Sequence, residues 1–165
     1  MLSFPTYLQG QQLPVLTIGD STPLLRVREW IKGTPVEKFE KGKVYVVEFW
    51  ATWCRPCIAA MPHLSALAEK FRNKITILGI DIYENKTPSL AKVKAFVEST
   101  GHRMDYHVAA SDSNFMEVDW LVGTGEKDNG ISRSFVVNAQ GRLAWIGYPK
   151  DLEEVLPGIV TILGI

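Results

Sequence analysis

Residues 44–57 have the sequence VYVVEFWATWCRPC, and this stretch decides the fold. Its first half is apolar, β-branched or aromatic apart from Glu48, a composition typical of a buried strand. Apolar residues then recur at helical spacing over residues 58–71. The stretch therefore predicts a strand, a short turn and a helix, with Cys54 and Cys57 placed where the helix begins.

The first turn of a helix is a chemically useful place for these two cysteines. It carries roughly half a positive charge and several unpaired N–H groups, which favour a thiolate over a thiol. Arg55 adds a positive charge between the cysteines, and Pro56 suits a first turn because its φ is fixed and it has no N–H. Because positions i and i+3 share one helix face, the sulfurs of Cys54 and Cys57 can form a disulfide.

A C-x-x-C pair has other uses, which the rest of the chain disfavours. A zinc site needs about four ligands, but the chain has two cysteines, and its histidines form no ligand-spaced pair. Covalent c-type haem requires a histidine directly after the second cysteine, where Ile58 stands. A purely structural disulfide would close so short a loop that it would stabilise the fold little. We therefore favour a redox-active pair and expect no metal.

At these residues the chain resembles the thioredoxin superfamily, and most of all its TlpA- and ResA-like thiol–disulfide oxidoreductases. The resemblance rests on residues 48–57 and on Pro62, five residues after the second cysteine. It is supported by 130–131, 135–137 and 141–143, and it covers about residues 24–163. It implies an α/β, thioredoxin-like fold, in which a central mixed β-sheet is flanked by helices and preceded by an N-terminal β-hairpin.

The resemblance also assigns roles to site residues. It implies that Cys54 attacks a partner disulfide as a thiolate and that Cys57 resolves the mixed disulfide. Glu48 matches the buried acid that exchanges protons with the second cysteine in thioredoxins, and burial raises a carboxyl pKa toward the range useful for such transfer. The alternative is an exposed Glu48 on an edge strand. No organic cofactor is needed.

The loop expected to face the cysteines departs from the family pattern. Ser132 stands where most members have a cis-proline, in the setting Gly130-Ile131-Ser132-Arg133. A cis bond before a non-proline residue costs about 2.5–4 kcal/mol, against about 0.5–1 before proline, so we expect the Ile131–Ser132 bond to be trans. Arg133 is expected either to face the sulfurs or to be solvated. The expected surround of the cysteine pair is Trp53, Arg55, Pro56, Ile131, Ser132 and Arg133.

Composition bounds the remaining possibilities. The chain has 165 residues, 46% of them hydrophobic, and 18 basic residues balance 18 acidic ones. This balance disfavours binding to nucleic acid or to an anionic membrane surface. No apolar run approaches the roughly 18 residues of a membrane span. The first residues lack the pattern of a signal peptide, whereas the family resemblance favours an extracytoplasmic protein, so the compartment stays open.

Patterning along the chain suggests one domain with an extension. We expect residues 1–23, which are polar and rich in Gly and Pro, to form an N-terminal extension, and residues 24–165 to form the thioredoxin-like domain. Strands 24–31 and 36–39 would form the hairpin. Further strands are expected at 75–81, 104–109, 134–137 and 142–147, and helices at 57–72, 88–100, 112–122 and 151–162.

The leading hypothesis is a thiol–disulfide oxidoreductase of the reductase or isomerase type. It would act as a monomer on protein thiols and disulfides and receive electrons from an upstream dithiol donor. A binding module that lost efficient turnover with its proline is the competing hypothesis. A peroxide-reducing thiol enzyme is a weaker third, because such enzymes usually have a threonine-assisted cysteine in a different sequence setting.

Overall fold

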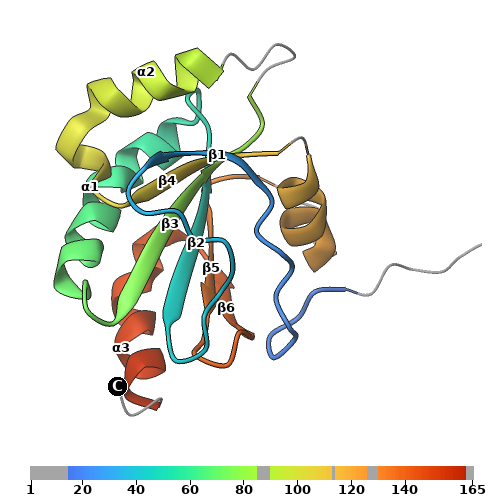
Figure 1. Ribbon diagram of the computed structural model, residues 1–165. Coiled ribbons are helices and arrows are strands. Elements are labelled where there is room, and N and C mark those ends of the chain that lie inside the picture. Colours follow the sequence, from blue (N-terminus) through green and yellow to red (C-terminus); the bar gives the residue numbers. More distant parts are fainter. Residues whose placement is uncertain (1–14, 85–89, 113, 126–129, 163–165) are drawn as a thin grey trace, which may run out of the picture.

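The computed structural model describes residues 15–84, 90–112, 114–125 and 130–162, which form one six-stranded mixed sheet flanked by helices (Figure 1). The strand order is β1-β4-β3-β2-β5-β6. The strands are β1 (Val27–Lys32), β2 (Val44–Trp50), β3 (Ile75–Asp81), β4 (His107–Ser111), β5 (Arg133–Val137) and β6 (Leu143–Gly147). Within these described residues the α-helices are α1 (Arg55–Lys70), α2 (Leu90–Thr100) and α3 (Leu152–Ile162). The expected α/β class and central mixed sheet are confirmed.

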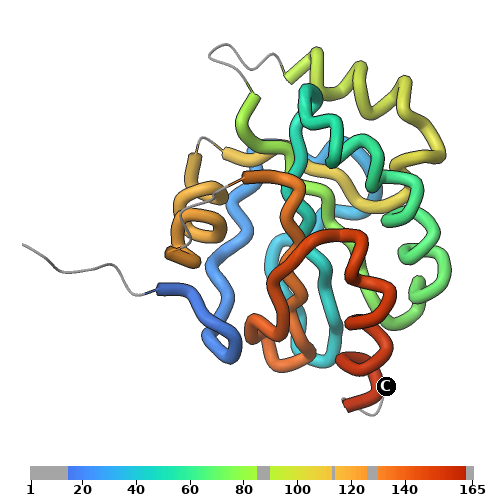
Figure 2. Tube along the Cα trace, turned by 180° about the vertical axis from the view of Figure 1, so that it is seen from behind, coloured from blue at the N-terminus to red at the C-terminus, as the bar shows by residue number. Residues whose placement is uncertain are grey.

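Each face of the sheet has its own covering layer. Helices α1, α2 and α3 all pack on one face, where their buried side chains join those of alternate sheet residues in one core cluster. The opposite face is covered by a short helical segment that includes Glu117–Leu121, a single π-helical turn, and by residues from 16 to 39. Figures 1 and 2 show the three helices on one side of the sheet and these segments on the other.

Strand β2 lies near the centre of the sheet and is buried along all seven residues. It pairs in parallel with β3 and antiparallel with β5, so that Glu48 lies between Gly79 and Ser134. A strand buried on both faces is expected to be almost continuously apolar, which is the pattern of β2 apart from Glu48. The alternative of an edge strand with an exposed Glu48 is therefore wrong.

The expected N-terminal hairpin does not form. Strand β1 pairs antiparallel with β4, with Trp30 opposite Ala109, and residues 36–39 are not a strand. Val36 and Phe39 instead pack their side chains on the apolar face opposite the helices. The apolar pattern that suggested a returning strand comes from this burial, because periodicity reports which side chains are covered and not which backbone is paired.

Three further elements differ in position or kind from expectation. Helix α1, expected at residues 57–72, begins two residues earlier, at Arg55, because Cys54 is its N-cap. The strand expected at 104–109 is β4, displaced to His107–Ser111, because residues 101–104 form a 3₁₀ turn. The segment expected as a helix at 112–122 includes a π-helical turn followed by a 3₁₀ turn at Val122–Thr124. The expected helix start at Pro88 lies outside the described residues.

Part of the expected N-terminal extension packs against the domain. The Leu16 N–H donates to the Gly123 carbonyl at 2.7 Å, and the Gly19 N–H donates to the Leu143 carbonyl at the same distance.

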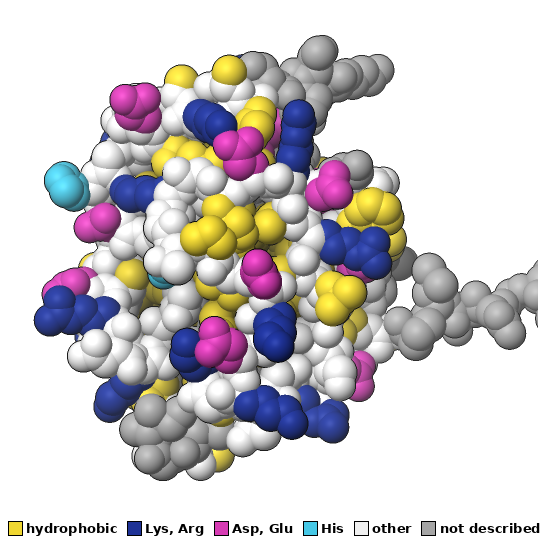
Figure 3. All heavy atoms as spheres, viewed as in Figure 1, with side chains coloured by type: hydrophobic (Ala, Val, Ile, Leu, Met, Phe, Trp, Pro, Cys, Tyr) yellow, Lys and Arg dark blue, Asp and Glu magenta, His cyan; other side chains and the backbone are white. Residues whose placement is uncertain are grey.

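Across the part of the chain that the structure describes, no helix is both long and apolar enough to cross a membrane. Figure 3 shows basic and acidic side chains interspersed over the face viewed, as the balanced composition leads one to expect.

Trp120 anchors the covering layer opposite the helices, and its removal tests that layer. It is fully buried, and its ring centroid lies 6.1 Å from that of Phe49 and 5.3 Å from that of Phe135. We expect Trp120→Ala to lower the free energy of unfolding by about 3–5 kcal/mol through lost burial and a residual cavity. Val118→Ala, at an exposed position in the same turn, should change it by less than about 0.5 kcal/mol. Equal losses in denaturant unfolding would contradict this assignment.

Candidate active site

The two cysteines form a disulfide at the start of α1. The sulfurs are 2.12 Å apart and the Cα atoms 5.3 Å apart. The peptide leaves β2 and turns through residues 51–53, and Cys54 then caps the helix in an extended conformation with φ −83° and ψ 100°. Pro56 occupies the first turn, where its missing N–H costs no intrahelical hydrogen bond. The spacing and location expected from the sequence are confirmed.

The helix N-terminus acts on one sulfur in particular. The Cys57 backbone N–H donates to Cys54 Sγ at 3.3 Å, so Cys54 Sγ accepts one of the N–H groups that a helix start leaves unpaired. This contact favours negative charge on Cys54. Cys57 Sγ instead lies 3.9 Å from the Phe49 carbonyl oxygen, a group that cannot donate. The two sulfurs therefore have different environments.

The two cysteines are buried, whereas the residues next to them in the chain are exposed. Cys54 and Cys57 are 2% and 1% exposed in the disulfide state, while Trp53 beside them is 53% exposed. Arg55 and Pro56 are exposed as well. The disulfide thus lies just beneath a surface formed by its sequence neighbours, and a partner chain would first meet these exposed side chains.

Glu48 lies buried on the face of β2 that is covered by the helices. It is 2% exposed, and its carboxylate accepts a hydrogen bond from Ser132 Oγ at 2.5 Å and another from Ser134 Oγ. Burial raises the pKa of Glu48 to about 7, while the two hydroxyl donors oppose that rise by stabilising the charged form. A buried carboxyl near neutrality, as expected, can accept and release a proton at neutral pH.

The Ile131–Ser132 bond is cis, so the expectation of a trans bond is wrong. That expectation weighed only the local preference of the dipeptide. In the folded chain, Ser132 directly precedes β5, whose Arg133 and Ser134 pair with Phe49 and Glu48, and its hydroxyl bonds Glu48. These tertiary contacts fix the position of the loop, and the sequence preference alone could not weigh them.

Arg133 is buried rather than solvated. Strand alternation places it on the same face of β5 as Phe135, opposite to Ser132 and Ser134. Its guanidinium carbon lies 5.3 Å from the ring centroid of Tyr148, a cation–π distance. A direct approach of Arg133 to the sulfurs stays a prediction.

Carboxyl groups that the sequence analysis did not place in the site lie at the carboxyl end of β3. Glu84 accepts hydrogen bonds from the backbone N–H and the hydroxyl of Thr52, at 2.6 and 2.8 Å. Trp53 Nε1 donates to the Tyr83 carbonyl at 2.8 Å. These contacts tie the peptide before Cys54 to the loop after β3. The position of Glu84 could have been predicted from a parallel pairing of β2 with β3, because the carboxyl ends of neighbouring parallel strands lie at the same edge of a sheet.

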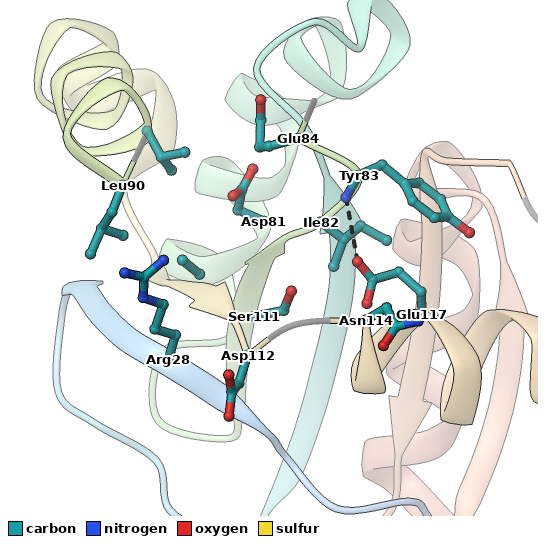
Figure 4. Close-up of a pocket in the computed structure, with 12 residues that line it drawn as sticks. Arg28, Asp81, Ile82, Tyr83, Glu84, Leu90, Ser111, Asp112, Asn114 and Glu117 are labelled. Carbon is teal, nitrogen blue, oxygen red and sulfur yellow. Dashed lines mark hydrogen bonds between the residues drawn. The ribbon is translucent and has the colours of Figure 1, made fainter. Parts of the chain in front are cut away.

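Asp81 and Glu117 share this edge with Glu84, around a pocket of about 600 Å³ (Figure 4). Glu117 Oε1 accepts from the Tyr83 N–H at 3.4 Å, the contact dashed in Figure 4. Burial and then the neighbouring Glu84 raise the pKa of Asp81 to about 9. Burial likewise raises the pKa of Glu117. Among the described residues, no cluster of three or more His, Cys, Asp or Glu side chains has the arrangement of a metal site.

A second cavity, of about 660 Å³, opens beside the first turns of α1. Pro56, Ala60 and His63 of α1 line one wall, and Ser132 and Tyr148 line the other. Ser132 therefore lies between this cavity and the buried Glu48. Of the expected surround, the structure brings Pro56 and Ser132 together here, while Trp53 faces the loop after β3.

The Glu48 environment has a consequence for stability. Because its pKa is raised in the folded state, its neutral form contributes stability that is present below about pH 4.5 and is lost as the pH rises through about 7. The loss is of order 3 kcal/mol. We expect Glu48→Gln, which does not titrate, to unfold in denaturant with that part of the pH dependence removed. Glu69→Gln, at an exposed position on α1, should match the unaltered protein, and a Glu48→Gln profile that also matches would contradict the assignment.

Comparisons with known proteins agree with this geometry. The Redoxin family model matches residues 10–163. Protein FixW of Rhizobium leguminosarum is 29% identical over 149 residues, which cover 88% of this chain and 66% of FixW. The thiol-disulfide oxidoreductase ResA of Bacillus anthracis is 34% identical over 145 residues, covering 87% of this chain and 76% of ResA. The match with FixW, at 66%, spans just under two thirds of the length of that protein.

Solved structures show the same fold. The thioredoxin domain of a thiol-disulfide oxidoreductase from Bacteroides vulgatus superposes with a TM-score of 0.69 at 21% identity, covering 88% of this chain and 99% of that one. A putative protein disulfide isomerase from Bacteroides thetaiotaomicron gives a TM-score of 0.66 at 25% identity, covering 90% and 89%. The chain belongs to the redoxin family, and its Cys54–Cys57 pair makes it a thiol–disulfide oxidoreductase domain of thioredoxin-like fold.

Proposed function

We propose that Cys54 is the attacking thiolate and Cys57 the resolving thiol in reactions with protein disulfides. The observation that carries this order is the hydrogen bond from the Cys57 N–H to Cys54 Sγ, which favours the thiolate at Cys54. The Cys54 thiolate attacks one sulfur of the partner disulfide and releases the other as a thiolate. Cys57 then attacks Cys54 Sγ, which closes the Cys54–Cys57 disulfide and releases the second partner thiolate. Two electrons pass from the dithiol to the partner.

Glu48 supplies the proton acceptor for the second step. Cys57 is 1% exposed, so its thiol proton needs a buried acceptor before the sulfur can attack. Glu48 precedes Phe49, whose carbonyl lies beside Cys57 Sγ, and its pKa of about 7 suits reversible transfer at neutral pH. Glu48 is idle in the first step, because Cys54 already attacks as a thiolate.

The partners follow from this chemistry and from the family. The substrates are protein thiols and disulfides, and an upstream dithiol donor returns the pair to its reduced state. We infer that the chain acts as a monomer, and that it works in an extracytoplasmic compartment, as the resemblance to TlpA- and ResA-like proteins implies. A redox-silent binding module is not favoured, because the pair forms a disulfide and relatives such as ResA are thiol-disulfide oxidoreductases.

Insulin reduction with a dithiol donor tests the activity. The unaltered protein should accelerate insulin precipitation, and Cys54→Ser should abolish the acceleration because no attacking thiolate remains. Cys57→Ser should also block turnover, but it should accumulate a mixed disulfide that is visible by mass spectrometry. An unaltered protein as inert as Cys54→Ser would overturn the proposal.

The role of Glu48 is tested by separating the two steps. We expect Glu48→Gln to leave attack on a model disulfide nearly unchanged and to slow resolution of the mixed disulfide by about a hundredfold, the lower end of a general-base contribution. Stopped-flow tryptophan fluorescence can follow both steps. Resolution at the unaltered rate from about pH 6 to about pH 9, on both sides of the Glu48 pKa, would leave Glu48 with a structural role only.

A further inference from the structure

We propose that Ser132 is the proton outlet of Glu48, carrying the proton that Glu48 receives out to the cavity beside α1. This inference rests on the proposed role of Glu48 as proton acceptor. It assigns a chemical function to the position at which this chain departs from its family.

The two hydroxyls that bond Glu48 differ in what lies behind them. Ser132 Oγ donates to Oε1 and Ser134 Oγ to Oε2. Ser134 is fully buried within β5, between the central strand β2 and the edge strand β6. Ser132 is 8% exposed and lines the 660 Å³ cavity that opens beside Pro56. Ser132 therefore joins the buried carboxyl to a space large enough for several water molecules.

A route is needed because the groups that exchange the proton are covered. Cys57 and Glu48 are 1% and 2% exposed, so a carboxyl that has accepted a proton must release it through a neighbour before the next cycle. A hydroxyl can do this because it accepts and donates at the same time. The proline usual at this position has neither capacity.

The transfer balances without any change of oxidation state. Glu48, protonated on Oε1, passes its proton to Ser132 Oγ while the hydroxyl proton of Ser132 passes to a water molecule in the cavity. The hydroxyl is thereby restored and the carboxylate regenerated. In the reverse reaction, the same path delivers a proton to Glu48 and from there to the Cys57 thiolate.

Other titratable groups lie near this path, and their contribution to proton transfer must be separated from that of Ser132. Tyr106 is buried on the Glu48 side, and burial together with Glu48 raises its pKa, so it stays protonated. His63 of α1 and Lys150, after β6, line the cavity. The Nε2 atom of His63 is buried and has no hydrogen-bond partner within the described structure, so His63→Gln is a necessary control.

Ser132→Ala and Ser134→Ala form a matched pair. Each removes one hydroxyl donor to the carboxylate, so each should raise the pKa of Glu48 and move the midpoint of the pH profile of resolution upward. The readout is the high-pH plateau of the steady-state rate of insulin reduction, because Glu48 must release its proton between successive cycles. In Ser132→Ala we expect this plateau to fall about tenfold below that of Ser134→Ala, a smaller loss than that of a full general base because Glu48 itself remains.

Chemical rescue makes the test specific to proton release. Imidazole is small enough to enter the cavity, and we expect increasing imidazole to restore the rate of Ser132→Ala while leaving Ser134→Ala and the unaltered protein unaffected. Ser132→Thr, which keeps a hydroxyl, should retain most of the plateau rate. His63→Gln should leave both the plateau and the rescue unchanged. If Ser132→Ala fails to fold, Ser132→Gly serves as the variant without a hydroxyl.

A measurement on the unaltered protein gives an independent outcome. In mixtures of H₂O and D₂O, two protons moving together through Ser132 should give a curved dependence of the steady-state turnover rate on deuterium content, and a straight line or no dependence would overturn the proposal. So would a Ser132→Ala profile identical to that of Ser134→Ala. If Glu48→Gln itself resolves at the unaltered rate, the failure lies instead in the proposed role of Glu48.

Discussion

The burial of strand β2 between β3 and β5 is the constraint on which the rest of the structure depends. Because this strand is covered on both faces, its ladder with β3 and β5 fixes where its carboxyl end emerges, and α1 starts there with Cys54 as its N-cap. The same strand carries Glu48 into the core beneath the helix. One element therefore sets both the helix terminus that favours a Cys54 thiolate and the buried carboxyl beside Phe49.

The polar groups of the site form two sets, one at the loop after β3 and one where β5 begins. On the β3 side, Glu84 and Tyr83 hold the peptide that leads into Cys54, while burial keeps a proton on Asp81 up to about pH 9. On the β5 side, two hydroxyls support Glu48. Burial raises the pKa of both Asp81 and Glu48. For Glu48, the hydrogen bonds from the two serine hydroxyls oppose that rise, and its pKa is about 7. The first set is thus suited to positioning and the second to proton exchange.

The serine at position 132 changes what the loop before β5 can do. The proline that the family resemblance leads one to expect there has no side-chain hydrogen-bond donor or acceptor. Here the side chain is polar and bonds a buried carboxylate, and the same residue lines the cavity beside α1. The guanidinium of Arg133 lies 5.3 Å from the ring centroid of Tyr148, a residue that lines the same cavity as Ser132. The backbone still enters β5 in register with β2, so the substitution alters the chemistry of the loop while the sheet is retained.

The sequence by itself determined the central strand, helix α1, the cysteine pair at its start and the mixed sheet, because apolar periodicity and the C-x-x-C motif are local signals. It also predicted the burial of Glu48 through the family resemblance. Only the tertiary structure decided that residues 36–39 pack without pairing, that the Ile131–Ser132 bond is cis, that Ser132 bonds Glu48, and that Glu84 and Ser134 join the site. These features depend on contacts between segments distant in the chain. Pairing partners, hydroxyl donors and shared burial arise only when the sheet brings such segments together, and no local pattern encodes them.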